Sequence, residues 1–581
     1  MGLLPQIAAG NTSRVMTDDF KGYNHNLKIA DGEFYDAKNL TTQYYPVLSN
    51  RAKRGHKQTF TRFQGITSLN DKLAYVDDGT LYYDGEPTSI TSLTEGEKQL
   101  VCTGAYIVVF PDLKYYNTVD PEDSGNICSD LTIENAYLTF RMCNSQGVEY
   151  GEAIKSETPP EDPKDGDIWI DTKYNVLKVY TVSTITWTEI TNVYTKIIIP
   201  PQPEGLRPSD HFKDYDGVTI EGTDYEDLNG TKILYSVGDN YVVVVGILDN
   251  EFTQTGATFH IYQTVPKMDY VVECQNRLWG CYYGIDSEGK TLNEIYCCAL
   301  GDFRNWHQFL GISTDSYVAS VGTEGPWTGA VNYLGYPTFF KENRIHRVAV
   351  SPIGAHQIND TPCRGVQAGS SKSLQVINET LYYKSKECIC AYQGGFPQDV
   401  STALGDVLYF KATSGAYNNR YYLSMEDAEG NSNLFVCDLK NGLWMREDDL
   451  KVNTFTRIAD ELYAVSGNEL IALRGTTGEL EDRVEWMAET GMMYWEYPDH
   501  KYLSRYNVRL QMEKGSRLEM YIEYDSEGYW TPAGEILFQG TNTVTIPVRP
   551  RRCDHLKMRL VGKGNVKIFS IARVFEMGSD I

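Results

Sequence analysis

The sequence lacks the long apolar run that a membrane-spanning helix requires. No stretch of the 581 residues approaches about 18 consecutive apolar residues, and the longest candidate, 241–248, has only the length of a β-strand. The first seven residues hold no charged segment ahead of an apolar run, so we expect no secretory signal. The sequence therefore predicts a chain without a membrane-spanning segment.

The 12 cysteines include no CxxC pair, which is the commonest spacing of zinc ligands. Cys297 and Cys298 are adjacent, and Cys388 and Cys390 are spaced so that both thiols lie on one face of a strand. Because no export signal is expected, we predict reduced thiols, a protein assembled in the cytosol and no zinc site.

Positive charge is scarce. Lys and Arg number 53 against 78 Asp and Glu, which gives a formal net charge of −25. Proteins that bind nucleic acid without sequence preference neutralise phosphates with basic residues, so we do not expect this chain to bind DNA over its whole surface. The charge equally serves to keep a large protein soluble. A small basic cluster between Arg51 and Lys57 is expected to face solvent or an acidic neighbour.

Familiar catalytic signatures are also missing. No GxSxG elbow stands out and no HExxH motif is present. The closest approach to a sialidase Asp-box, at 525–530, has the wrong spacing and occurs once. Acidic pairs such as Asp77–Asp78 and Asp448–Asp449 are typical of solvated turns. We therefore predict that the chain is not an enzyme and has no catalytic residue, cofactor-binding residue or metal ligand.

No long helical apolar stripe occurs, so the core is expected to consist of sheets. What recurs instead is a turn followed at once by a short aliphatic and aromatic run, a pattern typical of β-propellers. We expect one such run as the inner strand of each four-stranded blade, and about seven blades, with six or eight left open. The copies are Asn70–Tyr75, Gly104–Val109, Asn276–Trp279, Gly335–Phe340, Asn378–Tyr383, Gly405–Phe410 and Asp460–Tyr463.

Breaks in this repeat divide the chain into five parts. Residues 1–60 form an N-terminal segment expected to complete or clasp the propeller, and 61–124 form its first blades. Residues 125–267 are predicted to be inserted small β-domains. The remaining blades follow at 268–480. Five or more strands that alternate apolar and polar residues predict a C-terminal β-sandwich at 481–581.

Four tryptophans are candidate anchors of these modules. Trp169 and Trp187 are expected to staple a small antiparallel sheet inside the insert. Trp306 and Trp444 each follow a strand and a tight turn, so each is expected to lead the last strand of an outer hairpin. Further along the insert, the stretch 216–245 predicts a small β-barrel with a hairpin turn at 238–240.

Three motifs resemble those of tailed-bacteriophage proteins. The phrases Phe20–Tyr23, Asn39–Leu40 and 46–51 look like the opening of portal-proximal propeller proteins. The stretch 163–172 followed by Trp187 is similar to a P-x-x-G-D-x-W-x-D-T…W module of phage tail and fibre proteins. The ending, 562–580, resembles the end of the same propeller family. Among these proteins the chain resembles the tail nozzle, or tail tubular, proteins of short-tailed phages.

That resemblance implies a structural protein of the virion tail, made in the host cytoplasm. It implies a homo-oligomeric ring, a hexamer, below the portal and adaptor proteins and in contact with tail fibre or other distal tail proteins. The ring would retain the double-stranded DNA genome and conduct it during ejection without specific binding. An acidic channel that repels phosphate fits this function. The insert near 125–265 is then expected to form contacts between neighbours or a gate.

Other functions stay open. A receptor- or glycan-binding tail protein would use exposed Tyr and Trp side chains, which stack on sugar rings, and binding by an isolated 484–581 domain would favour it. A propeller glycosidase or depolymerase would use paired carboxylates as acid and base. A propeller interaction protein unrelated to phages is the third alternative.

Overall fold

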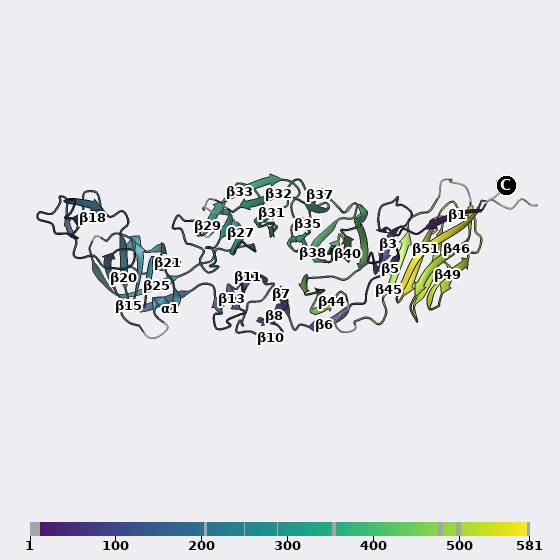
Figure 1. The fold of residues 1–581 in the computed structure, drawn as a ribbon, viewed down its shortest axis with the longest axis horizontal. Helices are drawn as coiled ribbons and strands as arrows, with labels where there is room; N and C mark the ends of the chain where they lie inside the picture. The colour runs from purple at the N-terminus through teal and green to yellow at the C-terminus, as the bar shows by residue number, and fades with distance from the viewer. Residues whose placement is uncertain are drawn as a thin grey trace, which may run out of the picture.

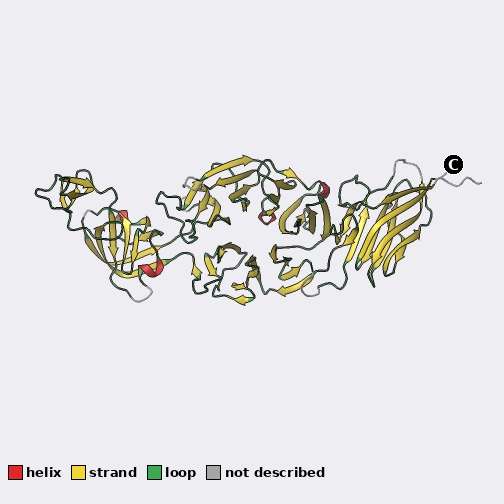
Figure 2. Cartoon of the chain, in the orientation of Figure 1, coloured by secondary structure: helices red, strands yellow, loops and turns green. Residues whose placement is uncertain are grey.

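The computed structural model describes residues 12–202, 206–248, 250–286, 289–350, 356–474, 480–494 and 501–577. The molecule is elongated, with the insert at one end, a ring of small sheets in the middle and a two-sheet unit at the other end (Figure 1). Strands dominate throughout, which confirms the all-β β-propeller predicted from the sequence (Figure 2). The described helices are α1 (Pro208–His211), η1 (Glu226–Leu228), η2 (Ser371–Ser373) and η3 (Thr402–Leu404). None of these helices has the length and apolar character required to cross a membrane.

Seven four-stranded antiparallel sheets of the described residues make up the ring, and we number them in chain order as propeller sheets one to seven. The first four are β7 (Phe63–Leu69), β8 (Lys72–Asp77), β9 (Thr80–Tyr83) and β10 (Glu86–Pro87); β11 (Gln99–Thr103), β12 (Tyr106–Phe110), β13 (Lys114–Asn117) and β14 (Gly125–Asn126); β26 (Tyr270–Cys274), β27 (Arg277–Ile285), β28 (Thr291–Cys297) and β29 (Tyr317–Ser320); and β30 (Gly329–Tyr333), β31 (Tyr336–Lys341), β32 (Arg344–Ala349) and β33 (Gln357–Pro362).

The last three sheets complete the ring, and the seventh takes its outer strand from the N-terminal segment. They are β34 (Gln375–Ile377), β35 (Thr380–Lys384), β36 (Ile389–Tyr392) and β37 (Gln398–Asp399); β38 (Tyr409–Tyr417), β39 (Arg420–Asp427), β40 (Ser432–Asp438) and β41 (Leu443–Asp448); and β42 (Thr454–Ile458), β43 (Glu461–Ser466), β44 (Glu469–Ala472) and β6 (Gly55–Thr59). Strand β6 pairs antiparallel with β44, so two segments far apart in the sequence share the seventh sheet.

The first strands of the propeller sheets lie around the axis of the ring. Strand β7 contacts β11 and β42, β11 contacts β26, β26 contacts β30, and β38 contacts both β34 and β42. The short helix η2, which precedes the fifth sheet, contacts β30, β35 and β38 and lines the axis there. The innermost element of most sheets is therefore the first strand, and in the fifth sheet η2 joins it.

The repeated sequence signature marks the second strand, so the prediction that it marks the inner strand is wrong. It forms β8, β12, β27, β31, β35 and β43, whereas the copy at 405–410 leads into a first strand, β38. A second strand is flanked by strands on both edges and covered by neighbouring sheets on both faces, so its run is apolar throughout. In β8, the residues Leu73 to Val76 are all buried. The turn before it, Asn70–Asp71, has φ of +54° and +57°, as a two-residue hairpin of type I′ requires.

The insert contains two sheets and its own hydrophobic core. The larger has seven strands, and its end strands β22 and β23 are successive parts of one segment, 230–238, which pairs with β21 on one side and with β24 on the other. The two edges of the sheet therefore meet, as the predicted small barrel requires. The expected hairpin turn is present, because Gly238 and Tyr241 pair across Asp239–Asn240. In sheet order the strands are β22 (Gly230–Ile233), β21 (Gly217–Glu221), β25 (Phe252–Tyr262), β15 (Asp130–Cys143), β20 (Tyr194–Ile198), β24 (Tyr241–Val245) and β23 (Ser236–Gly238), and in the smaller sheet β16 (Ile154–Ser156), β17 (Ile168–Asp171), β18 (Val176–Thr181) and β19 (Thr186–Glu189).

The unit at the C-terminal end has two six-stranded sheets around one hydrophobic core. Five of its strands come from the N-terminal segment, so among the strands described in residues 12–60 only β6 lies in the propeller. One sheet holds β1 (Thr12–Thr17), β4 (Leu40–Thr41), β5 (Leu48–Asn50), β46 (Lys501–Met512), β49 (Gly540–Pro547) and β51 (Val566–Met577), and the other β2 (Gly22–Tyr23), β3 (Glu33–Lys38), β45 (Glu485–Thr490), β47 (Arg517–Tyr524), β48 (Thr531–Ile536) and β50 (Leu556–Lys563).

A buried ion network ties the N-terminal segment to the propeller. Arg54 is hydrogen-bonded to Asp448 at 2.6 Å and to Glu447 at 2.8 Å, and Arg51 binds Glu481 through both carboxylate oxygens at 2.7 and 2.8 Å. The two arginine side chains are buried, as expected for the alternative in which the basic cluster meets acidic neighbours. Asp448 is buried with them, so the prediction that its acidic pair lies in a solvated turn is wrong.

Candidate functional site

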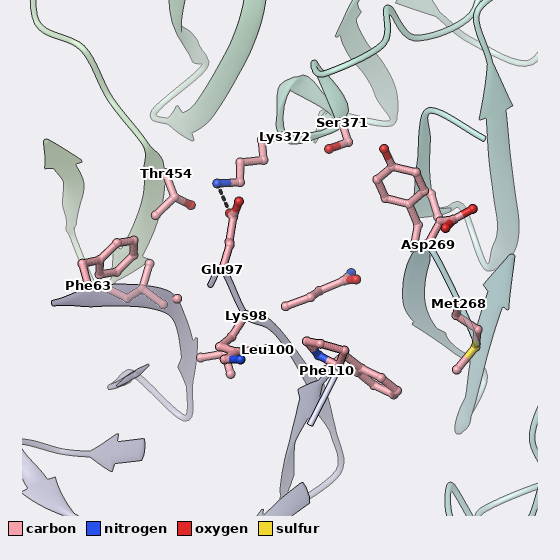
Figure 3. Close-up of a pocket in the computed structure, with 16 residues that line it drawn as sticks. Phe63, Glu97, Lys98, Leu100, Phe110, Met268, Asp269, Ser371, Lys372 and Thr454 are labelled. Carbon is pink, nitrogen blue, oxygen red and sulfur yellow. Dashed lines mark ion pairs between the residues drawn. The ribbon is translucent and has the colours of Figure 1, made fainter. Parts of the chain in front are cut away.

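A cavity of about 580 Å³ lies on the axis of the ring, and we call it the axial cavity. Most of its walls come from the beginnings of the first strands and from the segments just before them, and Phe110 and Pro111 lie at the end of β12, a second strand (Figure 3). Residues that are far apart in the sequence meet there because the ring brings these ends together. The lining residues are Phe63, Gly65, Ile66, Glu97, Lys98, Gln99, Leu100, Phe110, Pro111, Met268, Asp269, Tyr270, Ala330, Ser371, Lys372 and Thr454.

An ion pair between Glu97 and Lys372 joins opposite walls of the axial cavity (Figure 3). Glu97 precedes β11 in the second propeller sheet, and Lys372 belongs to η2, which precedes the fifth. The Lys372 ammonium also donates to the backbone carbonyl of Asn453 at 2.8 Å. Both side chains of the ion pair are exposed to solvent, at 64% and 39%, so both groups can reach a molecule in the cavity.

A second ion pair lies inside the wall rather than at its surface. Lys98 and Asp112 are 2.7 Å apart with side chains 0% and 4% exposed, and Lys98 also donates to Thr94 Oγ1 at 2.7 Å. Burial opposes ionisation of Asp112, but the hydrogen bonds from Lys98 and Thr94 outweigh it, and the pKa of this carboxyl is lowered. The Lys98–Asp112 pair therefore fixes the position of the segment before β11, which carries Glu97.

Asp269 and Tyr270 form the wall at the start of the third propeller sheet. The Asp269 carboxylate accepts the backbone N–H of Tyr283 at 2.9 Å and points away from Glu97 (Figure 3). Burial raises the pKa of the Asp269 carboxyl and that of the Tyr270 hydroxyl. The cavity is thus lined by two carboxylates, Glu97 and Asp269. They lie in different environments and do not point toward each other.

The tryptophans singled out from the sequence lie elsewhere. Trp169 and Trp187 meet edge to face in the small sheet of the insert, with ring centroids 5.5 Å apart. Trp444 lies in β41, the last strand of the expected outer hairpin, and donates to the carbonyl of Val400 at 2.8 Å. Trp306 is buried in a loop and β28 pairs with β29, so the prediction of a Trp306-led strand is wrong.

Sequence reasoning did not single out Glu97, Asp269 or Lys372. No motif joins them, because their proximity follows only from closure of the ring. Among the residues that the structure describes, no group of three or more His, Cys, Asp or Glu side chains is arranged to hold a metal ion.

No family model and no curated protein matches the chain. Solved structures similar to it include an exo-β-1,3-galactanase from Phanerochaete chrysosporium at 9% identity, covering 52% of this chain and 95% of that chain with a TM-score of 0.22. An arabinoxylan arabinofuranohydrolase of glycoside hydrolase family 43 from Bacillus subtilis has 11% identity, covering 52% of this chain and 94% of that chain, with a TM-score of 0.20. A Trypanosoma rangeli sialidase has 9% identity, covering 98% and 96% respectively, with a TM-score of 0.23.

Two predictions made from the sequence, the nozzle function and the prediction that the chain is not an enzyme, are not borne out by these comparisons. The three structures are glycan-active enzymes, and none of them is a phage tail protein. At such TM-scores the activities of these enzymes do not carry over to this chain. Its function has to be argued from the axial cavity itself.

Proposed function

We propose that the protein is a glycan-binding β-propeller and that an oligosaccharide occupies the axial cavity. The observation that supports this most strongly is the lining of a cavity of about 580 Å³. Its volume lies within the range of small-molecule sites. Glu97 and Lys372 offer charged groups for hydroxyls, while Phe63 and Tyr270 offer aromatic faces for the apolar faces of sugar rings.

The architecture that we propose around this site is more specific than a propeller alone. The seven propeller sheets are taken as seven blades, and β6 closes the ring by joining the seventh. The two six-stranded sheets are taken as a β-sandwich, because side chains from both contribute to one core. The homo-oligomeric ring, the phage tail partners and the location in the virion remain predictions from the sequence alone.

Binding is tested on the full chain by titrating a panel of neutral and acidic oligosaccharides in a calorimeter. For a sugar that binds, we expect Glu97→Gln and Lys372→Met to weaken binding by about tenfold each, since each removes a charge-assisted hydrogen bond of roughly 1.4 kcal/mol. The matched control is Glu485→Gln, which breaks an exposed ion pair with Lys563 far from the cavity. Binding that is unchanged in both cavity variants, or no binding by any sugar, contradicts the proposal.

A second candidate function, glycoside hydrolysis, is favoured by the different environments of the two cavity carboxylates. A carboxyl with a raised pKa, such as that of Asp269, suits a general acid, and a carboxylate paired with a lysine, such as Glu97, suits a base or nucleophile. Asp269 would first have to turn into the cavity. We expect Asp269→Asn to abolish release of reducing ends while leaving binding intact. A wild-type chain that binds a sugar and never cleaves it rejects hydrolysis but retains binding.

A further inference from the structure

Two thiols lie side by side in the fifth propeller sheet. Cys390 is in β36, and Cys388 ends the turn 385–388 that joins β35 to β36. Their sulfur atoms are 3.7 Å apart, close to van der Waals contact. Cys390 is fully buried, whereas Cys388 retains 7% exposure beside the exposed Glu387. A reagent that comes from solvent therefore meets Cys388 first.

Hydrogen-bond donors and cations surround Cys388. The Ser385 hydroxyl lies 3.4 Å from its sulfur, and Arg364 Nη1 donates to the same sulfur at 3.7 Å. The buried ammonium of Lys384 donates to the carbonyl of Ser385 at 2.5 Å. Arg364 is also paired with Glu387 at 3.5 Å, and Asp399, which pairs with Cys390 across the sheet, is the acidic group that opposes ionisation of Cys388. The donors and cations favour a negatively charged sulfur at position 388.

The neighbouring thiol of Cys390 also favours ionisation of Cys388. A hydrogen bond from Cys390 lowers the pKa of the Cys388 thiol despite its burial, and Arg364 adds to this effect. The same interaction raises the pKa of Cys390, so Cys388 loses its proton before Cys390 does. Burial raises the pKa of the half-exposed thiols of Cys102 and Cys363. The pKa of the Cys388 thiol is thus lowered, whereas that of these more accessible cysteines is raised.

We propose that Cys388 and Cys390 form a thiol–disulfide exchange site, in which Cys388 attacks small organic disulfides and Cys390 resolves the product. The site lies outside the axial cavity and does not depend on the glycan-binding function. The sulfur separation, the cations around Cys388 and the difference in exposure between the two thiols carry the proposal.

The reaction balances in two steps. The Cys388 thiolate attacks one sulfur of a disulfide RSSR, forms a mixed disulfide and expels RS⁻. Cys390 then loses its proton to solvent and attacks the Cys388 sulfur, which forms the Cys388–Cys390 disulfide and expels a second RS⁻. Two protein thiols are oxidised and RSSR is reduced to two thiols. The sulfurs must approach to about 2.05 Å for this bond. This approach has to come from the turn that carries Cys388, because Cys390 is paired with Tyr383 and Asp399 in its sheet.

The test uses the full-length reduced protein and bis(2-hydroxyethyl) disulfide, which is small enough to reach Cys388. Intact-mass spectrometry follows the reaction, and alkylation with peptide mapping locates it. We expect the wild type to lose two hydrogens at 388 and 390, about tenfold faster than adducts form at Cys102 or Cys363. Cys390→Ser is expected to accumulate one adduct at Cys388, and Cys388→Ser to react at neither position.

The matched control is Cys363→Ser, which removes a nearby half-buried thiol and is expected to leave the rate unchanged. A wild type that reacts first at another cysteine overturns the proposal, as does Cys390→Ser protein without the Cys388 adduct. The order in which the wild-type cysteines react is enough to support or overturn the proposal, so a variant that fails to fold does not spoil the test.

Discussion

Asp216 provides a quantitative test of how the insert is attached to the propeller. Its side chain is 5% exposed and accepts the backbone N–H of Lys213 at 2.9 Å, while the Asn305 amide of the third propeller sheet's loop lies at 3.5 Å. Burial raises the pKa of this carboxyl from 3.8 to about 6, and the nearby Asp302 adds to the effect. The ionised carboxylate is therefore unfavourable in the folded protein at neutral pH.

The sign and the size of the effect follow from the two pKa values. Because the folded protein binds this proton more tightly than the unfolded chain, stability rises as pH falls through about 6 and levels off near 4. Above pH 6, a shift of about two units corresponds to a cost of about 3 kcal/mol. Asp216→Asn removes the charge and retains an acceptor for Lys213. We expect it to stabilise the attached insert by about 1–3 kcal/mol at pH 7.5 and by about a third as much at pH 4.5, where the carboxyl of the unfolded chain is still largely ionised.

The assay is hydrogen exchange of the amides of β21, the strand that follows Asp216, corrected for the intrinsic effect of pH. This local measurement is required because a chain of several units does not unfold in one step. The control is Asp214→Asn, since Asp214 is exposed and accepts the N–H of Val237 at 2.8 Å. Equal protection of β21 in wild type and Asp216→Asn at pH 7.5, or an identical pH profile in both, refutes the reasoning.

Three other substitutions test the packing. Trp169→Ala removes an almost fully buried ring from the small sheet and is expected to cost about 3–5 kcal/mol; proteolysis then cuts this sheet and leaves the propeller intact. Gly217→Ala places a methyl group 2.3 Å from the His307 carbonyl, so the insert is expected to detach, visible as an increase in the radius of gyration in solution scattering. Lys98→Met leaves Asp112 buried without its cation, so we expect the protein to lose about 3–5 kcal/mol of stability, measured as a lower melting temperature. Adding Asp112→Asn to this variant is expected to restore part of the lost stability.

The parts of the fold that could be predicted are those with local causes. Turn pairs such as Gln275–Asn276 and Asn378–Glu379 adopt positive φ, and each joins the first and second strands of a propeller sheet. Asn, Asp and Gly tolerate this conformation, so the hairpins are visible in the sequence. The prediction that the aromatic run forms the inner strand of each sheet is wrong, because the place of that run depends on which strand is covered by neighbouring sheets.

Trp306 shows how a local pattern misleads. A strand, a turn and a tryptophan also occur at Trp444, where they do form a hairpin. At Trp306 the indole is buried from a loop and donates to the carbonyl of Phe303 at 2.8 Å, and the hairpin forms with β29 instead. Packing between sheets, not strand propensity, decides the structure here.

The candidate site could not be predicted for a related reason. Glu97 and Lys372 form an ion pair although they come from the second and fifth propeller sheets. Neither residue belongs to a motif, and each alone reads as an ordinary surface charge. Only the Cys388 and Cys390 spacing carried a signal in the sequence, since residues two apart on a strand share a face, although Cys388 lies in the turn just before β36.

The pairing of the chain's two ends decides how function can be tested. Strand β1 pairs with β51, and β3 pairs with β45, so the first 50 residues supply strands to both C-terminal sheets. An isolated 484–581 fragment would expose the edges of β45 and β51 and lose the apolar side chains that β2 to β5 bury, which favours aggregation over binding. Absence of glycan binding by such a fragment would therefore say nothing about the protein. Since β6 also closes the seventh propeller sheet, the same segment stabilises the ring around the axial cavity, and only the full chain presents that cavity intact.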